Sequence, residues 1–259
     1  MVPFAVRGRR TGINAALVFL CEVIGKHVTP ARLTLAECVD LSCAKAAPVA
    51  ELGLGWAKKK PIRTAADLDA IVLLARAGAP RVREDATAWV IEMLKGAQAA
   101  RPEHVRDLLD ARFGDVRAKA LDLFAADPRF RDDTGLWAAL SETPYDDARG
   151  FLLRHLEERR SALSAEATRH LWASTLLSIH RGARDKRAAL AQIAARIAER
   201  PADADPLLAL LGVALRSVRP PERRAALAAV AQAAFRAPAL REAIARRLPE
   251  LTLFREDAA

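Results

Sequence analysis

The sequence has few of the residues that build sheets or cross-link small domains. Aromatic residues make up 5% of its 259 residues, and glycine occurs only 12 times. β-Sheets are enriched in aromatic and β-branched residues, whereas the Ala, Leu and Arg that dominate this chain favour helices. We therefore expect an all-α fold with almost no strand. With 52% apolar and 28% charged residues, a chain of this length can bury a sizeable core without disulfides or metals.

Cysteine is also scarce. Cys21, Cys38 and Cys43 are odd in number and lack the C-x-x-C spacing that is typical of zinc and redox sites. Disulfide frameworks belong to oxidising compartments, and isolated cysteines of this kind usually pack as small core residues. The sequence therefore predicts three core thiols in a reducing, cytoplasmic environment.

Long hydrophobic runs are missing as well. A basic stretch, RGRR at 7–10, precedes an apolar run and so outlines a secretion signal, but Glu22 and Lys26 interrupt that run and no small-residue cleavage site follows. The second apolar run, at 206–215, is far too short to span a bilayer. We expect an amphipathic first helix and a protein that does not cross a membrane.

The motifs that usually carry chemistry are absent. The five histidines form no H-E-x-x-H pair, and the chain contains neither G-x-x-x-x-G-K-[ST] nor G-x-G-x-x-G. Neighbouring acids, such as Asp146 and Asp147, are adjacent in sequence and point in different directions on a helix. The sequence therefore predicts no metal, no cofactor and no catalytic residue, so we expect the protein not to be an enzyme.

What the sequence does contain is a repeat. GDVRAKALDLF at 114–124 is echoed by DDARGFLLRHL at 146–156, each with an arginine near the start of an Ala- and Leu-rich helical stripe. Three further segments align with these two. The aligned arginines are Arg83, Arg117, Arg149, Arg187 and Arg224, which are 34, 32, 38 and 37 residues apart. Self-similarity at this period is typical of helical-repeat proteins.

Each of these five helices follows another predicted helix, so the repeating unit is a helix pair. The first helices of the pairs are predicted at 64–78, 102–113, 132–142, 164–180 and 203–218. Thr64 with Asp67 has the spacing of a capping box, and Ser164 and Asp203 are expected N-caps. The start and stop residues keep the same period as the arginines, which supports the helix pair as the repeating unit.

The helix pairs, with second helices that open on D-V-R or D-A-R, resemble HEAT repeats over roughly residues 64–254. This resemblance implies an α-solenoid, a right-handed superhelix of antiparallel helix pairs. Residues 1–63 would form N-terminal helices that are degenerate repeats or a cap, and 64–259 a repeat array continuous with them as a single solenoid. Because the pattern runs nearly to residue 259, the chain is also compatible with a piece of a longer repeat protein or a subunit of an assembly.

One feature of the family pattern is missing. HEAT repeats typically carry an aspartate about six residues before the aligned arginine, and this aspartate helps to link successive units. The corresponding positions here are Ala77, Ala111, Thr143, Arg181 and Val218. The linking ladder is therefore absent or rebuilt through other acids, for example Asp115, Asp146 or Asp147.

The aligned arginines admit two roles. The resemblance implies that they bond to loop carbonyls and to acids of the neighbouring unit. A row of guanidinium groups on a chain of net charge +9 would also match a phosphate backbone. We expect a non-enzymatic scaffold that binds another protein through an extended surface, with a nucleic-acid-binding module that uses the Arg-rich edge as the alternative.

A third interpretation is a HEAT-like DNA glycosylase. Members of that group use aromatic side chains and a catalytic acid on a basic face. The residues that could serve are Trp56, Trp89, Trp137 and Trp172, with Asp132, Asp133 or Glu142 as the acid near Trp137. No segment resembles the Trp and Asp motif of that group, and tryptophans spaced at about one per helix pair usually fill the core. This interpretation is therefore the least favoured of the three.

Overall fold

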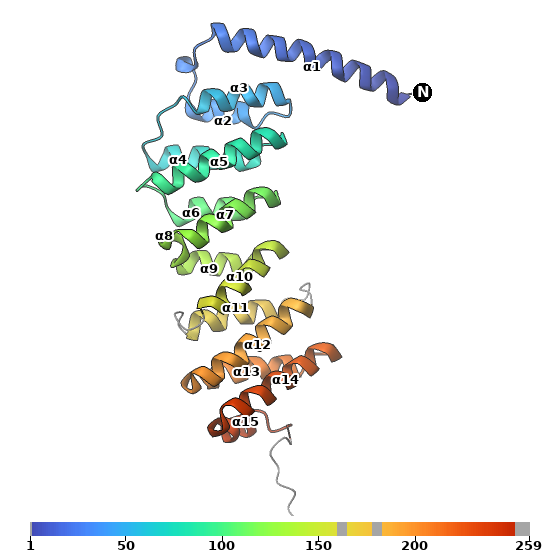
Figure 1. Cartoon of the computed structure of the whole chain (residues 1–259), viewed down its shortest axis with the longest axis vertical. Helices are drawn as coiled ribbons and strands as arrows, with labels where there is room; N and C mark the ends of the chain where they lie inside the picture. The colour runs from blue at the N-terminus through green and yellow to red at the C-terminus, as the bar shows by residue number, and fades with distance from the viewer. Residues whose placement is uncertain (1, 160–164, 178–182, 252–259) are drawn as a thin grey trace, which may run out of the picture. The chain divides into compact units, whose positions relative to one another are not determined.

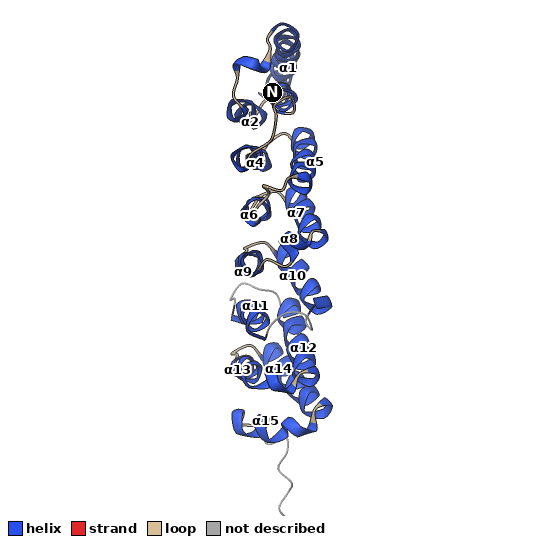
Figure 2. Cartoon of the chain, turned by 90° about the vertical axis from the view of Figure 1, so that its left-hand side faces the viewer, coloured by secondary structure: helices blue, strands red, loops and turns tan. Residues whose placement is uncertain are grey.

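The structure is a computed structural model that describes residues 2–159, 165–177 and 183–251, and every regular element in these ranges is a helix (Figures 1 and 2). The predicted all-α class is thereby confirmed. None of the helices in the described part of the chain has the length and apolar content needed to span a bilayer. The chain forms two compact units, Met1–Leu136 and Trp137–Ala259.

The first unit consists of two layers of helices. Its elements are α1 (Val2–His27), η1 (Pro30–Arg32), α2 (Leu35–Ser42), α3 (Ala47–Ala57), α4 (Ala65–Val72), η2 (Leu73–Arg76), α5 (Pro80–Gly96), α6 (Pro102–Leu109), α7 (Gly114–Ala126) and α8 (Pro128–Arg131). Helices α2, α4 and α6 contact one another in that order and form one layer, and α3, α5 and α7 form the other (Figure 2). Helix α1 packs on α3.

The second unit has the same pattern of contacts. Helix α9 (Thr134–Glu142) ends in this unit, and the elements that follow are α10 (Asp146–Arg159), α11 (Ala165–Leu177), α12 (Ala183–Glu199), η3 (Pro201–Asp203), α13 (Ala204–Leu215), α14 (Pro220–Arg236), η4 (Pro238–Leu240) and α15 (Arg241–Arg247). Helices α10, α12 and α14 contact in order, as do α11, α13 and α15. The helices predicted from the repeat pattern lie at the positions expected for both members of each pair.

Capping residues explain where several helices begin. Thr64 and Asp67 form the predicted capping box of α4, and Thr34 and Glu37 form a second one at α2. Asp203 stands at the N-cap of α13, but its carboxylate accepts a hydrogen bond from Arg196 Nε (2.7 Å) instead of capping the helix. The predicted N-cap position is therefore confirmed, and the side chain bonds elsewhere because Arg196 is almost wholly buried and needs an acid. Ser164 lies outside the described residues.

The core is built from the apolar stripes of these helices. Val116, Ala120, Leu123 and Phe124 of α7 are at most 1% exposed, as the periodicity predicts. Helices α2 and α3 approach so closely that a Cβ added at Gly53 would lie 2.5 Å from the backbone nitrogen of Ser42. Glycine is therefore required there for packing and not for a phosphate-binding turn.

The predicted division of the chain at residues 63 and 64 marks where the clear repeats begin, whereas the two compact units meet at 136 and 137. The continuity of a single solenoid through both units stays a prediction. The three cysteines are free thiols: Cys21 and Cys38 are buried and Cys43 is half-buried. Burial raises the pKa of the Cys38 and Cys43 thiols, so both stay protonated and unreactive near neutral pH.

Candidate binding groove and the arginine series

Three of the aligned arginines donate to backbone carbonyls in the loops just past the helices that precede them. Arg117 donates from Nη1 to the Ala111 carbonyl (2.8 Å), and Arg149 donates from Nη1 to the Thr143 carbonyl (3.0 Å). Arg83 reaches the equivalent carbonyl, that of Ala77, at 3.3 Å. Each of these carbonyls lies one or two residues past the end of the preceding helix, at Ala77 after η2, Ala111 after α6 and Thr143 after α9. In all three cases a guanidinium six residues further along the chain supplies a donor to a loop carbonyl that has no partner within a helix.

Acids pair with two of these arginines, Arg83 and Arg149. The Arg83 Nε lies 2.8 Å from one carboxylate oxygen of Asp115 and 3.1 Å from the other, so the ion pair joins α5 to α7. The Arg83 guanidinium also stacks on the ring of Phe113, 3.8 Å from its centroid. Arg149 pairs with Asp146 of its own helix. Asp115 and Asp146 were among the acids predicted to rebuild the missing ladder, and the structure pairs both with aligned arginines.

The last two members of the series sit differently. Arg83, Arg117 and Arg149 are each the fourth residue of their helix, and the fourth residues of α12 and α14 are Lys186 and Arg223. Lys186 is buried, as are Ala189, Leu190 and Ile193 after it, whereas Arg187 and Arg224 are exposed. The sequence alignment is therefore one residue late in α12 and α14.

Replacing one of the carbonyl-binding arginines should destabilise the fold. We expect Arg117→Ala to lower the free energy of unfolding by about 2 kcal/mol, because a charged donor to a loop carbonyl and a packed side chain are both lost. Arg224→Ala, at an exposed position, should change it by less than about 0.5 kcal/mol. Denaturant titration followed by circular dichroism measures both values. Equal, small effects of the two substitutions would contradict a structural role for Arg117.

The tryptophans and acids named for the glycosylase interpretation have positions that packing and local hydrogen bonds explain. Trp56, Trp137 and Trp172 are at most 5% exposed, and Trp89 packs partly buried against the cluster that contains Trp56. A carboxylate oxygen of Asp133 accepts a hydrogen bond from the Leu136 backbone N–H (2.8 Å) at the start of α9. Asp132 lies 3.4 Å from Arg131, and Glu142 is exposed. The buried tryptophans are core residues, as their spacing predicts.

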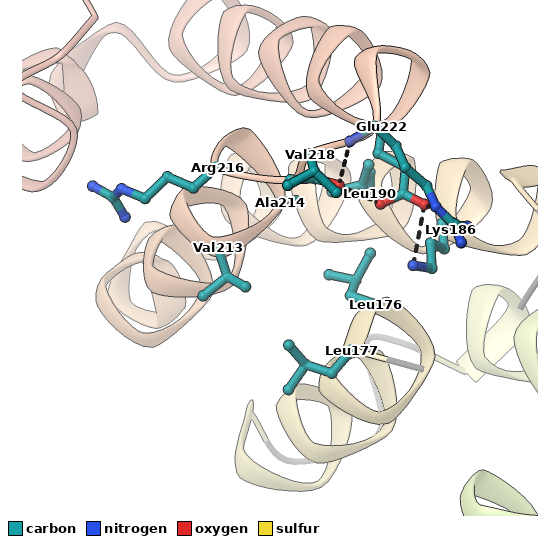
Figure 3. Close-up of a pocket in the computed structure, with 11 residues that line it drawn as sticks. Leu176, Leu177, Lys186, Leu190, Val213, Ala214, Arg216, Val218 and Glu222 are labelled. Carbon is teal, nitrogen blue, oxygen red and sulfur yellow. Dashed lines mark hydrogen bonds and ion pairs between the residues drawn. The ribbon is translucent and has the colours of Figure 1, made fainter. Parts of the chain in front are cut away.

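A groove lies in the second unit, where α11 and α13 end and α12 and α14 begin (Figure 3). Its volume is about 390 Å³, within the range of sites that accept small ligands or a few side chains. The lining residues are Leu176, Leu177, Lys186, Leu190, Val213, Ala214, Arg216, Ser217, Val218, Arg219 and Glu222. Three of the aliphatic ones are open to solvent: Leu177 is 60% exposed, Val213 48% and Val218 91%.

An ion pair forms one wall of the groove. The Lys186 ammonium lies 3.1 Å from Glu222 Oε1, and the two side chains are only 8% and 12% exposed. The other carboxylate oxygen of Glu222 accepts a hydrogen bond from the Ser217 hydroxyl (2.6 Å), and the Arg219 guanidinium lies 3.5 Å from Oε1. Burial alone would raise the pKa of Glu222. The hydrogen bonds from Ser217 and Lys186, together with the charges of Lys186 and Arg219, outweigh burial and lower that pKa.

The groove was not predicted from the sequence. Val218 was noted only as the position where the family has an aspartate, and Lys186 and Glu222 are 36 residues apart. Two of the predicted arginines lie close to the ion pair in the chain: Arg187 directly follows Lys186, and Arg224 lies two residues after Glu222. Both are at the starts of the two helices that flank the groove. The one sequence signal was the apolar character of 206–215 on all its faces, because a helix of that kind cannot bury every side chain in one pair.

A second hollow lies in the first unit, with a volume of about 610 Å³. It is lined by Cys43, Val72, Leu73, Ala75, Arg76, Asp107, Asp110, Ala111 and Arg112. Burial raises the pKa of Asp110, and the nearby Arg106 opposes this shift. Across the described ranges, no three His, Cys, Asp or Glu side chains are grouped so that they could hold a metal. The hollow contains acids and bases together and has no residue arrangement that indicates a reaction.

The chain was compared with protein-family models, with curated proteins and with solved structures. None of the three comparisons gives a significant match.

Proposed function

We propose that this chain is a non-enzymatic, HEAT-like helical-repeat scaffold that binds another protein. The observation that carries the proposal is the groove of the second unit, around which Leu177, Val213 and Val218 leave their aliphatic side chains in solvent. A cluster of exposed apolar side chains with a polar rim is typical of protein-interaction sites. The two layers of helices within each unit, which contact in chain order, support the repeat architecture.

The alternative, a nucleic-acid-binding edge, has less support. It requires guanidinium groups that are available to phosphate, but the guanidinium groups of Arg83, Arg117 and Arg149 bond to loop carbonyls, and Arg117 and Arg149 are less than 10% exposed. Fluorescence anisotropy with labelled duplex and single-stranded oligonucleotides tests this alternative directly. Phosphate binding requires an affinity that falls steeply as salt is raised. Absence of binding at low salt would exclude it.

Affinity capture with matched variants tests the scaffold proposal. The groove variant is the double substitution Leu177→Asp with Val218→Asp, at two exposed positions where a carboxylate should not disturb folding. The control is Phe235→Asp, because Phe235 is 81% exposed and lies about 20 Å further along α14 from Glu222. Each protein is immobilised and exposed to an extract of cells that contain the natural chain, and bound proteins are quantified by mass spectrometry.

A specific protein should bind the wild type and the Phe235→Asp control and be depleted about tenfold on the groove variant, as for loss of interface anchor residues. The same protein, once purified, should bind the wild-type chain in calorimetry and bind the groove variant about tenfold more weakly. Identical sets of proteins on all three baits would contradict the groove as the binding site.

A further inference from the structure

The starts of α12 and α14 carry a concentration of positive charge. Residues 183–188 and 216–224 contain seven basic side chains and two acidic ones, and one of the seven, Arg216, also pairs with Glu250 from further along the chain. The two segments are held together by the ion pair between Lys186 and Glu222, so their charges lie at the same end of the two neighbouring helices α12 and α14. Both acidic residues lie in first turns, Asp185 in α12 and Glu222 in α14, and neither is exposed. Most of the solvent-facing charge there is guanidinium.

Helix stability does not account for this arrangement. The N-terminus of a helix is the positive end of its dipole, so basic side chains there are unfavourable and acidic ones favourable. Arg184 and Arg187 at the start of α12, and Arg223 and Arg224 at the start of α14, are all exposed and have the wrong sign for their positions. Cations and two helix N-termini together create a local field that attracts an anionic partner.

The apolar groove lies next to this positive region. Lys186 and Glu222 line the groove and also belong to the basic segments, and Arg216 and Arg219 belong to both as well. Leu190 is buried and Leu176 is half-buried, whereas Leu177, Val213 and Val218 are exposed, and all five line the groove (Figure 3). None of the lining residues is aromatic, so the groove has no platform on which a base could stack. Contact with the aliphatic side chains of a peptide would remove the exposed aliphatic surface of the groove from water, which is favourable. A sugar–phosphate backbone has no aliphatic side chains to offer.

We propose that the groove binds an acidic, aliphatic peptide segment of a partner protein. Its Leu, Ile or Val side chains would cover Leu177, Val213 and Val218, and its carboxylates would face the arginines at the starts of α12 and α14. This proposal rests on the proposed scaffold function and adds the chemical class of the partner. Such a segment satisfies both features of the site, because hydrophobic burial supplies affinity and opposite charge supplies orientation and a fast encounter.

A random peptide library displayed on phage tests the class of ligand without knowledge of the partner. The library is panned on the intact chain, after depletion on the Leu177→Asp, Val218→Asp variant. Recovered sequences should be enriched in Asp and Glu next to Leu, Ile or Val. A labelled peptide made from them should lose about tenfold in affinity on the groove variant and bind Phe235→Asp as it binds the wild type. A second variant, Arg223→Glu with Arg224→Glu, should also weaken it, and its affinity should fall as salt is raised.

Four results would overturn the proposal. They are recovery of basic or uncharged peptides, recovery of none, equal binding of a version of the peptide with serine in place of its aliphatic residues, and tight binding of a single-stranded oligonucleotide that displaces the peptide. Failure of the scaffold function is a different result, namely identical sets of captured proteins on all three baits. If the natural partner is lost on the groove variant but its binding does not respond to salt or to the Arg223, Arg224 reversal, the binding site stands and the acidic class of partner is wrong.

Discussion

Glu222→Ala is expected to lower the free energy of unfolding by about 3 kcal/mol. The substitution leaves the Lys186 ammonium, whose side chain is 8% exposed, without its carboxylate, and removal of one partner of a largely buried ion pair is among the most damaging single changes. It also removes the acceptor of the Ser217 hydroxyl. Urea titration measures the loss. Glu250→Ala is the matched control, because Glu250 pairs with Arg216 at 2.7 Å while both side chains are well exposed, and its effect should stay below about 1 kcal/mol.

The same ion pair predicts how stability responds to acid. Because the folded pKa of Glu222 lies below its value in the unfolded chain, this group stabilises the fold above its unfolded pKa of about 4.3, and the contribution is lost as pH falls through the folded pKa. Glu222→Gln should therefore flatten the fall in stability below about pH 5 relative to wild type.

A double substitution tests the cause of the Glu222→Ala loss. If Lys186→Met with Glu222→Leu proves as unstable as Glu222→Ala, an unpaired buried charge is not the cause of the loss.

The helices could be predicted because their signal is local and periodic. Leu190, Ile193 and Ile197 recur with helical spacing in the sequence, and all three are at most 1% exposed in α12. Helix caps are equally local, and the capping box of Thr64 with Asp67 was predicted correctly. The box of Thr34 with Glu37 has the same spacing and could have been predicted in the same way.

The contacts between helices could not be predicted to the residue. His104 is 1% exposed, and its Nε2 lies 2.9 Å from an Asp69 oxygen 35 residues earlier. Its Nδ1 accepts a hydrogen bond from the backbone N–H of Arg101. Neither pairing follows from periodicity, because spacing identifies the face of a helix and not the partner that meets it. A histidine at an otherwise apolar position indicates a buried polar contact, but the sequence does not name the acid.

The arginine series shows the same limit in another form. The repeat was visible because Arg83, Arg117 and Arg149 stand three residues into their helices, yet in α12 a lysine takes that place and an arginine follows it. An alignment based on residue type selects Arg187, whereas burial selects Lys186. The groove depends on this register, because the buried Lys186, and not the exposed Arg187, forms the ion pair with Glu222 in its wall.

Trp172→Ala should lower the free energy of unfolding by about 4 kcal/mol. The indole ring is fully buried at 0% exposure, and deletion of an aromatic side chain of this size leaves a cavity that the surrounding helices fill only in part. Trp89→Ala, at a partly buried tryptophan, is the comparison and should cost less. Both values come from denaturant titration followed by circular dichroism. A Trp172→Ala loss of less than about 1 kcal/mol would contradict the packing of α11 on α12.

The indole N–H of Trp172 also belongs to a series of buried hydrogen bonds. The cost of losing the hydrogen bond can therefore be measured separately from the cost of creating a cavity. Its Nε1–H donates to Gln192 Oε1 (2.9 Å), and the Gln192 amide donates to the Leu153 carbonyl (2.8 Å), so three helices, α11, α12 and α10, share one buried connection. Trp172→Phe keeps most of the volume but leaves the Gln192 oxygen without its donor, which should cost about 1–2 kcal/mol. In a double-mutant cycle with Gln192→Met, the two losses should fall short of additivity by more than about 0.5 kcal/mol. Strict additivity would mean that packing alone joins these helices, and that the repeat needs no polar residue to fix how one pair meets the next.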